Sequence, residues 1–446
     1  MKSSKNDFTT GPILKPLIIF SAPIMLANLL QTSFQIVDSL WVGNILGAEA
    51  LGAVAIATTI LVTILSFILG LNNAALTILS QQHGRNDQEG LKRYLNAFIV
   101  IMTLMSAVFA VIGYIFAESL LEVIGTPDAI LDMATSYLQI SLLGMFFLFG
   151  YNFINTVFRA LGDSKTPLRI VFLAVILNAV LSPLFMIVFD LGIQGAALAT
   201  VGSQATAFLY SAYLAVKRNL VPFKMPSLPA RYEVGLILKL GIPAGLQMGV
   251  IHAGMAAILS VVTQFGADSV AGFSAAQRLD SLIMLPAMAL GTAVNAMAGQ
   301  NISIQQWSRV KQIARYAALY NFGLMLSVAA VVIIFAEAGI RMFIQDEAAV
   351  EFGTDYLRIV ALCYPFLGLN FVLNGIVRAS GAMYQVLILN IISLWILRYP
   401  LSALFASHFG ESGVGMGMGV SFIISSIFAY LYYKFGNWKK RELFKN

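Results

Sequence analysis

A carboxylate stands inside the first long apolar run of the chain, residues 14–41, together with three side-chain amides. On a helix, their spacing of three, four and three positions places these residues on one face: Asn28, Gln31, Gln35 and Asp38. An ionised group in hydrocarbon costs several kcal/mol, so this face is expected to turn toward a protein interior or a hydrated cavity. There Asp38 can take up and release a cation; the alternative is a side chain that reaches the membrane interface. Pro23 lies in the same run and permits a bend, because it lacks a backbone N–H.

Polar and charged side chains also interrupt later apolar runs. Asn178 and Ser182 are four positions apart and therefore share a helix face. Arg278 and Asp280 are two positions apart and point in different directions on a helix, while Arg398 lies in another run. We expect an Asp280–Arg398 ion pair in the second half of the chain. A cargo contact or a second proton carrier at Asp280 is the alternative.

The elements that carry these residues are expected to be long apolar helices. Of the 446 residues, 59% are hydrophobic and 11% are charged, and the mean hydropathy is +0.83. This composition excludes an ordinary soluble domain, and the continuous apolar runs predict an all-α polytopic membrane protein. We predict twelve transmembrane helices, at residues 14–41, 50–80, 94–117, 130–158, 167–189, 193–216, 234–264, 269–299, 313–336, 352–377, 383–407 and 412–434.

Basic residues gather in the two terminal segments and in alternate loops, whereas the loops between them are mostly acidic. This distribution accounts for the net charge of +6 without a nucleic-acid partner, and it predicts that both termini are cytoplasmic. A single cysteine, Cys363, excludes an intrachain disulfide and a Cys-rich metal site. The sequence has no phosphate-binding P-loop, metal-spaced His/Cys cluster or nucleophile elbow. We therefore expect no enzymatic activity, no cofactor and no resident metal.

The chain repeats itself at an offset of 218–220 residues. The matching segments include Ser21–Pro23 with Gly241–Pro243, Thr135–Leu138 with Thr354–Leu357, and Phe158–Gly162 with Val377–Gly381. Six helices per copy give both copies the same orientation, which predicts two parallel repeats with a cargo cleft between them. The expected domains are an N-lobe at 1–216, a cytoplasmic linker at 217–233, and a C-lobe with a short basic tail at 234–446.

Three stretches resemble the multidrug and toxic compound extrusion (MATE) transporters. They are Pro23 with Asp38 in the first run, Leu46–Ala55 directly after it, and Arg159–Asp163, which reads Arg-Ala-Leu-Gly-Asp. The similarity covers nearly the whole chain, including the repeat, and looks most like the prokaryotic DNA-damage-inducible-type branch. It implies a V-shaped pair of six-helix lobes and a cation-coupled antiporter that exports amphipathic, often cationic drugs.

The resemblance also implies a cation-coupling site in the N-lobe, on its first, fourth, fifth and sixth helices: Asp38, Asn155, Asn178 and Thr200. Ser182 stands where a second carboxylate is common in the family, and this favours a proton as the coupling ion. Sodium at Asp38 is the alternative. Asn155 and Asn178 also have another possible role, as hydrogen-bonding links between helices.

A cargo cleft is expected to combine polar, aromatic and polarizable side chains: Gln31, Gln35, Phe149, Asp280, Met284 and Met288. The expected partners are small amphipathic or cationic compounds, H⁺ or Na⁺, and the lipid bilayer, with the protein acting as a monomer in the bacterial inner membrane. Two other functions stay open. A lipid-linked saccharide flippase of the same superfamily would want a cleft richer in arginine, and a channel or scaffold would show no uphill transport.

Overall fold

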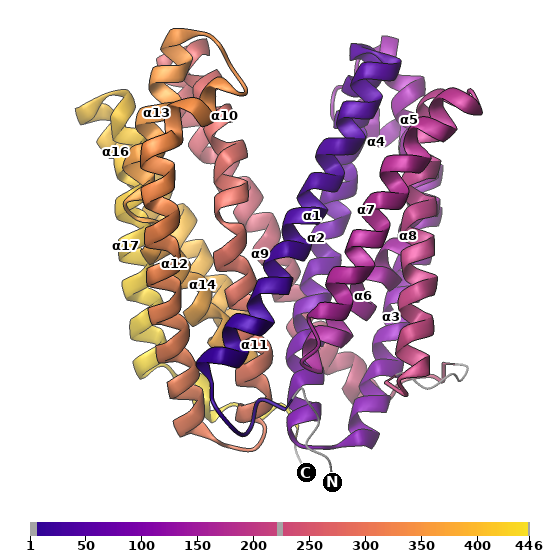
Figure 1. Cartoon of the computed structure of the whole chain (residues 1–446), viewed down its shortest axis with the longest axis vertical. Coiled ribbons are helices and arrows are strands. Elements are labelled where there is room, and N and C mark those ends of the chain that lie inside the picture. Colours follow the sequence, from indigo (N-terminus) through magenta and orange to yellow (C-terminus); the bar gives the residue numbers. More distant parts are fainter. Residues whose placement is uncertain (1–6, 221–225, 445–446) are drawn as a thin grey trace. The chain divides into compact units, whose positions relative to one another are not determined.

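The computed structural model describes residues 7–220 and 226–444. These residues are almost entirely helical, and none of them lies in a β-strand (Figure 1). Pro222 of the predicted linker and the last two residues of the predicted basic tail lie outside the described residues. The predicted all-α class is confirmed.

The helices follow one another with short connections. In the first half they are α1 (Leu14–Leu46), α2 (Ala48–Gly84), α3 (Gln88–Ile115), α4 (Ala117–Val123), α5 (Asp128–Leu143), α6 (Met145–Ala160), α7 (Lys165–Pro183), the π-helix η1 (Leu184–Val188) and α8 (Gly192–Lys217). In the second half they are α9 (Arg231–Val262), η2 (Thr263–Phe265), α10 (Ala267–Ile283), α11 (Leu285–Ile302), α12 (Trp307–Arg341), α13 (Glu347–Ala361), α14 (Tyr364–Ala379), α15 (Met383–Ile391), the π-helix η3 (Ile392–Arg398), α16 (Tyr399–Phe409), α17 (Glu411–Phe435) and η4 (Asn437–Lys440).

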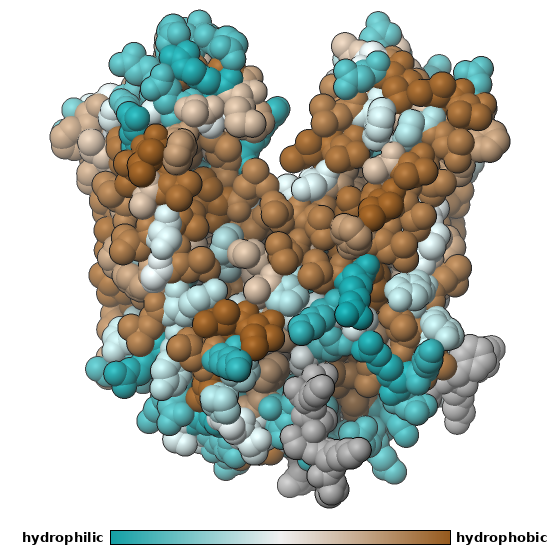
Figure 2. Space-filling view, in the orientation of Figure 1, coloured by the Kyte–Doolittle hydropathy of each residue, from teal (hydrophilic) through white to brown (hydrophobic). Residues whose placement is uncertain are grey.

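Most of these helices are suited to a membrane. Nine of the described helical segments are long and apolar enough to cross one, and the bent pairs α5–α6 and α13–α14 raise the number to as many as eleven. The predicted span at 193–216 forms α8, whose hydropathy is lowered by Gln194, Ser203 and Gln204. Figure 2 shows apolar side chains over the middle of the helices and hydrophilic side chains toward their ends. The chain is a multi-pass membrane protein, and each predicted span corresponds to a helix, a bent pair or a run of consecutive helical segments.

Both copies of the sequence repeat place glycine at the same chain reversals. Three pairs, related by the offset seen in the sequence, have positive φ angles: Gly47 with Gly266, Gly162 with Gly381, and Gly192 with Gly410. This backbone conformation is unfavourable for most other L residues, so each pair marks a turn that both copies require. The duplication is therefore visible in the backbone as well as in the sequence.

The chain forms two compact units whose borders fall inside two long helices. One unit is Leu26–Ile242, and the other combines Met1–Met25 with Pro243–Asn446. The borders divide α1 shortly after Pro23 and divide α9 directly before Pro243. These prolines are equivalent in the repeat. In both copies the chain therefore passes from one unit to the other beside a residue that lacks the backbone N–H needed for a helical hydrogen bond. The predicted lobe limits rest on the repeat and the loop composition, and they stay a proposal.

The segment before α1 is held within its own unit by α11 and α12. Arg309 donates hydrogen bonds to the carbonyl oxygens of Phe8, Thr10 and Gly11 at 3.0, 2.8 and 2.9 Å. The side-chain oxygen of Gln300 accepts the backbone N–H of Phe8 at 3.1 Å. These bonds explain why the beginning of α1 groups with the second half of the chain.

Candidate functional site

Asp38 is the buried member of the polar face on α1, with 6% of its surface exposed. Its Oδ1 accepts a hydrogen bond from Ser182 Oγ of α7 at 3.3 Å. Asn178 of α7 and Thr200 of α8 also lie within hydrogen-bonding reach of the carboxylate, and Asn178 Nδ2 donates to Thr200 Oγ1 at 3.2 Å. Two neighbouring helices of the Leu26–Ile242 unit therefore surround Asp38 with neutral polar groups.

The helix that supplies two of these groups changes its geometry beside them. Asn178 and Ser182 share one face of α7, which ends at Pro183 and continues as the π-helix η1. Pro183 cannot donate a backbone hydrogen bond, and a π-helical turn is a wider arrangement that often occurs at functional sites. The hydroxyl that binds Asp38 thus sits at the junction between regular and widened helix.

A tyrosine outside the predicted set of site residues also interacts with Asp38. Tyr137 of α5 is buried, interacts electrostatically with Asp38 and hydrogen-bonds Thr58 of α2. The available signal was its place in Thr135–Leu138, one of the segments that recur in the second copy. Its recurrence in both copies of the duplicated chain is the sequence signal that points to this position.

Asn155 of α6 is buried, but no described contact joins it to Asp38. It interacts with Tyr151, one turn earlier on the same helix. The side-chain carbonyl oxygens of Asn155 and Asn178 are both buried and have no hydrogen-bond partner among the described residues. A buried acceptor without a donor costs free energy. A hydrogen-bond donor or a cation that bound to either oxygen would remove this cost.

The other unit holds a buried carboxylate of its own. Asp280 of α10 is 2% exposed. Its Oδ2 accepts a hydrogen bond from the hydroxyl of Tyr356 at 3.2 Å, and its Oδ1 accepts one from the hydroxyl of Tyr364. Tyr356 is the repeat counterpart of Tyr137. Each unit therefore places the equivalent tyrosine near a buried carboxylate, although the carboxylates come from different helices of the repeat.

The expected Asp280–Arg398 ion pair is wrong. Arg398, at the end of η3, donates from Nε to Ser421 Oγ at 3.4 Å, and its guanidinium lies 4.7 Å from the ring centroid of Phe422. Among the described residues no ion pair joins it to Asp280, although the two charges interact at longer range. The physical reason is the helix packing: α10 packs against α13, which brings Tyr356 to the carboxylate, whereas η3 packs against α17.

The residues expected to bind cargo are distributed over both units. Gln31 is half-buried and Gln35 exposed on the part of α1 that belongs to Leu26–Ile242, whereas Met284 and Met288 belong to the other unit. Phe149 is 1% exposed and lines an apolar pocket between α3, α6 and α8. Neither unit by itself contains all the residues that are expected to bind cargo, and the cargo site stays a prediction.

The chemistry available around Asp38 is that of a site for one monovalent cation. It offers one negative charge, two hydroxyl oxygens and an amide oxygen without a donor. Among the described residues no group of three or more His, Cys, Asp or Glu side chains is placed to hold a metal ion. The expected role of Asp38 in exchanging a proton or an alkali ion stays a prediction.

Comparison with known proteins agrees with the internal duplication. The family model described as MatE matches the chain twice, at residues 23–184 and 243–404. The chain is 57% identical to "Probable multidrug resistance protein YpnP" of Bacillus subtilis (strain 168), over 98% of each chain. It is 24% identical to a Shewanella oneidensis protein described as an FAD transporter, over 96% of this chain and 95% of the other. Among solved structures, the MATE transporter VcmN of Vibrio cholerae shares the fold with a TM-score of 0.91, at 23% identity and over 96% of this chain and 99% of that one.

Proposed function

The chain belongs to the MATE family of multidrug efflux transporters, and we propose that it is a proton-coupled antiporter exporting small amphipathic, often cationic compounds. The observation that carries the proposal is the buried carboxylate of Asp38 among neutral partners, Ser182 above all. We further propose that it works as a monomer in the bacterial inner membrane with both termini in the cytoplasm. The family contains transporters, and the protein is not an enzyme.

A proton suits the chemistry at Asp38. One carboxylate supplies one negative charge, which a proton neutralises through a covalent bond without needing a coordination shell. Removal from water favours the neutral form of a carboxyl. In the ionised form Asp38 accepts the hydroxyl of Ser182; in the protonated form its own O–H can donate to Oδ1 of Asn178, which otherwise lacks a partner. Both protonation states therefore find hydrogen-bond partners.

Coupling requires that the proton and the cargo favour different conformations. Protonation removes the charge from α1, which lowers the cost of repacking Asp38 against α7 and α8. Gln35 and Gln31 lie about one and two turns from Asp38 along the same face of α1, so they move with it. In this scheme the proton displaces the cargo by moving α1. This helix passes from one compact unit to the other just beyond Pro23.

Dye efflux from proteoliposomes tests the proposal, with pH and sodium gradients imposed separately. We expect efflux in sodium-free buffer to follow a pH gradient and to stop when a protonophore is added. Because a relative is described as an FAD transporter, FAD should be tested as a competitor beside cationic dyes. Negligible efflux without sodium, restored by sodium, would contradict proton coupling.

Sodium coupling is the second candidate, and the unpaired Oδ1 of Asn178 is the observation that favours it. Hard cations prefer several oxygen ligands. In a site with a low dielectric constant, however, more than one negative charge binds a sodium ion better than a single charge does. Ser182→Asp adds a second carboxylate beside Asp38, and we expect it to make transport sodium-dependent. Ser182→Asn adds similar volume without charge and is the matched control. Equal sodium responses in both variants would show that charge at this position does not select the ion.

A further inference from the structure

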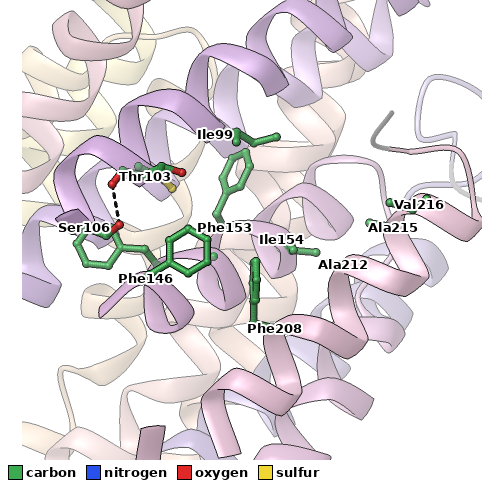
Figure 3. Close-up of a pocket in the computed structure, with 13 residues that line it drawn as sticks. Ile99, Thr103, Ser106, Phe146, Phe153, Ile154, Phe208, Ala212, Ala215 and Val216 are labelled. Carbon is green, nitrogen blue, oxygen red and sulfur yellow. Dashed lines mark hydrogen bonds between the residues drawn. The ribbon is translucent and has the colours of Figure 1, made fainter. Parts of the chain in front are cut away.

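An apolar pocket of about 170 Å³ lies within the Leu26–Ile242 unit, between α3, α6 and α8 (Figure 3). Asp38 and its partners are not part of its lining. Its floor is formed by buried side chains, among them Met102, Phe149 and Phe153. Its rim includes the exposed residues Thr103 and Phe146. The pocket is thus deep on one side and open on the other.

The pocket exists because large side chains on one helix face small side chains on another, which leaves space between them. On α6, large aromatic side chains recur on one face, while small residues recur on α8: Phe146, Phe149 and Phe153 against Ala212 and Ala215. α6 packs against both α3 and α8, so it forms the base between them. The ring of Phe208 closes one wall over Gly150, where an added Cβ would lie 2.3 Å from the ring. Substitution of this glycine would therefore displace the wall.

The interior of the pocket suits hydrocarbon better than water. Ser106 is buried, but its hydroxyl already donates to the carbonyl oxygen of Thr103 at 2.8 Å (Figure 3). None of the described lining residues presents a buried side-chain polar atom without a partner. A cavity of about 150 Å³ lined by Leu, Ile and Phe stays dry and binds benzene. The pocket is therefore large enough for several carbons of an alkyl chain.

The described surface near the pocket includes exposed apolar side chains, and an exposed lysine lies near one end. Leu104 of α3 and Leu209 of α8 are 61% and 63% exposed. Val216 lines the pocket, and the next residue, Lys217, is exposed with its ammonium 5.5 Å from the ring centroid of Tyr213. No carboxylate among the described residues forms an ion pair with Lys217, whereas its neighbour Arg218 pairs with Asp163 at 2.7 Å. An amphiphile with a negative head group complements this arrangement.

We propose that this pocket binds one acyl chain of an anionic phospholipid of the bilayer, with the head group beside Lys217. The exposed apolar surface of α3 and α8 makes the pocket continuous with the acyl region, where phospholipid is abundant. Ile154, which lines the pocket, adjoins Asn155 on α6, and α8 also carries Thr200. A bound chain therefore contacts α6 and α8, the helices that carry these two residues. Binding does not depend on which ion is coupled.

Photolabelling of the purified full-length protein tests the proposal. The protein is placed in phosphatidylcholine vesicles containing a small share of phosphatidylglycerol with a diazirine in its acyl chain, and labelled peptides are identified by mass spectrometry. We expect label on the pocket-lining parts of α3, α6 and α8. Ala212→Phe fills the pocket and should lose most of this label. Leu198→Phe, at an exposed position of the same helix that does not line the pocket, is the matched control and should keep it.

Two further variants keep the test decisive. If Ala212→Phe does not elute as a folded protein in size-exclusion chromatography, Ile99→Trp fills the pocket from the α3 side. Lys217→Gln should keep the label in the pocket but lose the preference for phosphatidylglycerol over a phosphatidylcholine carrying the same diazirine chain. Equal labelling of the filled variants and Leu198→Phe would overturn the proposal. So would labelling of the pocket by a diazirine fatty acid but not by the phospholipid.

Discussion

Asp38 and Asp280 differ in how firmly their surroundings hold their buried carboxylates. Asp280 accepts hydrogen bonds from two tyrosine hydroxyls, one at each oxygen. Asp38 accepts a hydrogen bond of 3.3 Å from the hydroxyl of Ser182, and Asn178 and Thr200 also lie within hydrogen-bonding reach. The amide oxygen of Asn178, however, has no hydrogen-bond partner among the described residues. A fully satisfied buried polar network stabilises one arrangement, whereas a partly satisfied one changes more readily. At the scale of residues, this contrast supports the proposal that Asp38 exchanges an ion while Asp280 contributes to structural stability.

Asp38→Asn should abolish coupled efflux while the protein still folds, because the change removes the ionisable group and nearly preserves its shape. Efflux in proteoliposomes and size-exclusion elution measure the two properties. Asp190→Asn is the control, because Asp190 is exposed and asparagine tolerates its positive φ angle. Normal efflux by Asp38→Asn at equal protein amounts would remove Asp38 from the mechanism.

Tyr356→Phe should lower the free energy of unfolding by about 1.5–3 kcal/mol, because it removes a hydrogen bond to a buried charged group. Denaturation in detergent measures the change. Tyr384→Phe, at an exposed tyrosine, is the control and should have little effect. Combined with Asp280→Asn, the loss should be smaller than the sum of the two single losses, since both variants break the same contact. Strict additivity would show that the bond contributes nothing to stability.

At the scale of elements, both copies of the repeat use helices whose regularity is interrupted near the polar sites. α1 contains Pro23 and belongs to both units, and α9 has the same design at Pro243. The fifth predicted span of each copy contains a π-helix next to a proline: η1 follows Pro183, and η3 ends two residues before Pro400. Interrupted hydrogen-bond ladders let a helix bend without unfolding. These are the elements that can move a buried side chain inside a packed bundle.

Pro23→Ala should slow transport without unfolding the protein, because it restores a backbone donor and stiffens α1 near the point where it changes unit. Initial rates of dye efflux measure the effect. Pro16→Ala is a control within the same helix, since Pro16 lies in the first turn of α1, where no helical hydrogen bond is lost. Equal rates for the wild type and both variants would assign no role to the bend.

At the scale of the whole molecule, the alternation of basic and acidic loops predicts the orientation in the membrane. In a Cys363→Ser background, cysteines replacing the exposed residues Asp128 and Glu347 should react with an impermeant reagent from outside. Cysteines replacing Gln88 and Lys311 should react only after permeabilisation. Lys311 is preferred over Arg309, whose guanidinium holds the segment before α1. The reverse labelling pattern would show that the termini are outside.

The sequence by itself determined the class, the spans and the duplication. Hydropathy is a local property that sets where helices cross a membrane, so the predicted spans correspond to helical segments of the structure. The repeat offset likewise found pairs such as Gly47 and Gly266, because a positive φ angle constrains the residue type directly. The grouping of Ser182 and Asn178 followed from helical periodicity within one element, and both lie beside Asp38 in the structure. Membership of the MATE family, suggested by the motifs, is confirmed; the branch within it stays a prediction.

Only the tertiary structure decided which side chains from distant parts of the chain meet. Asp280 binds Tyr356 and Tyr364, which lie 76 and 84 positions away, instead of pairing with Arg398. Opposite charges in apolar runs suggest a pair, but the contact depends on which helices pack together, and periodicity says nothing about that. The same reason explains why Tyr137 was missed at Asp38. It also explains why the sequence alone does not reveal the apolar pocket lined by Phe149, which arises where α6 packs between α3 and α8.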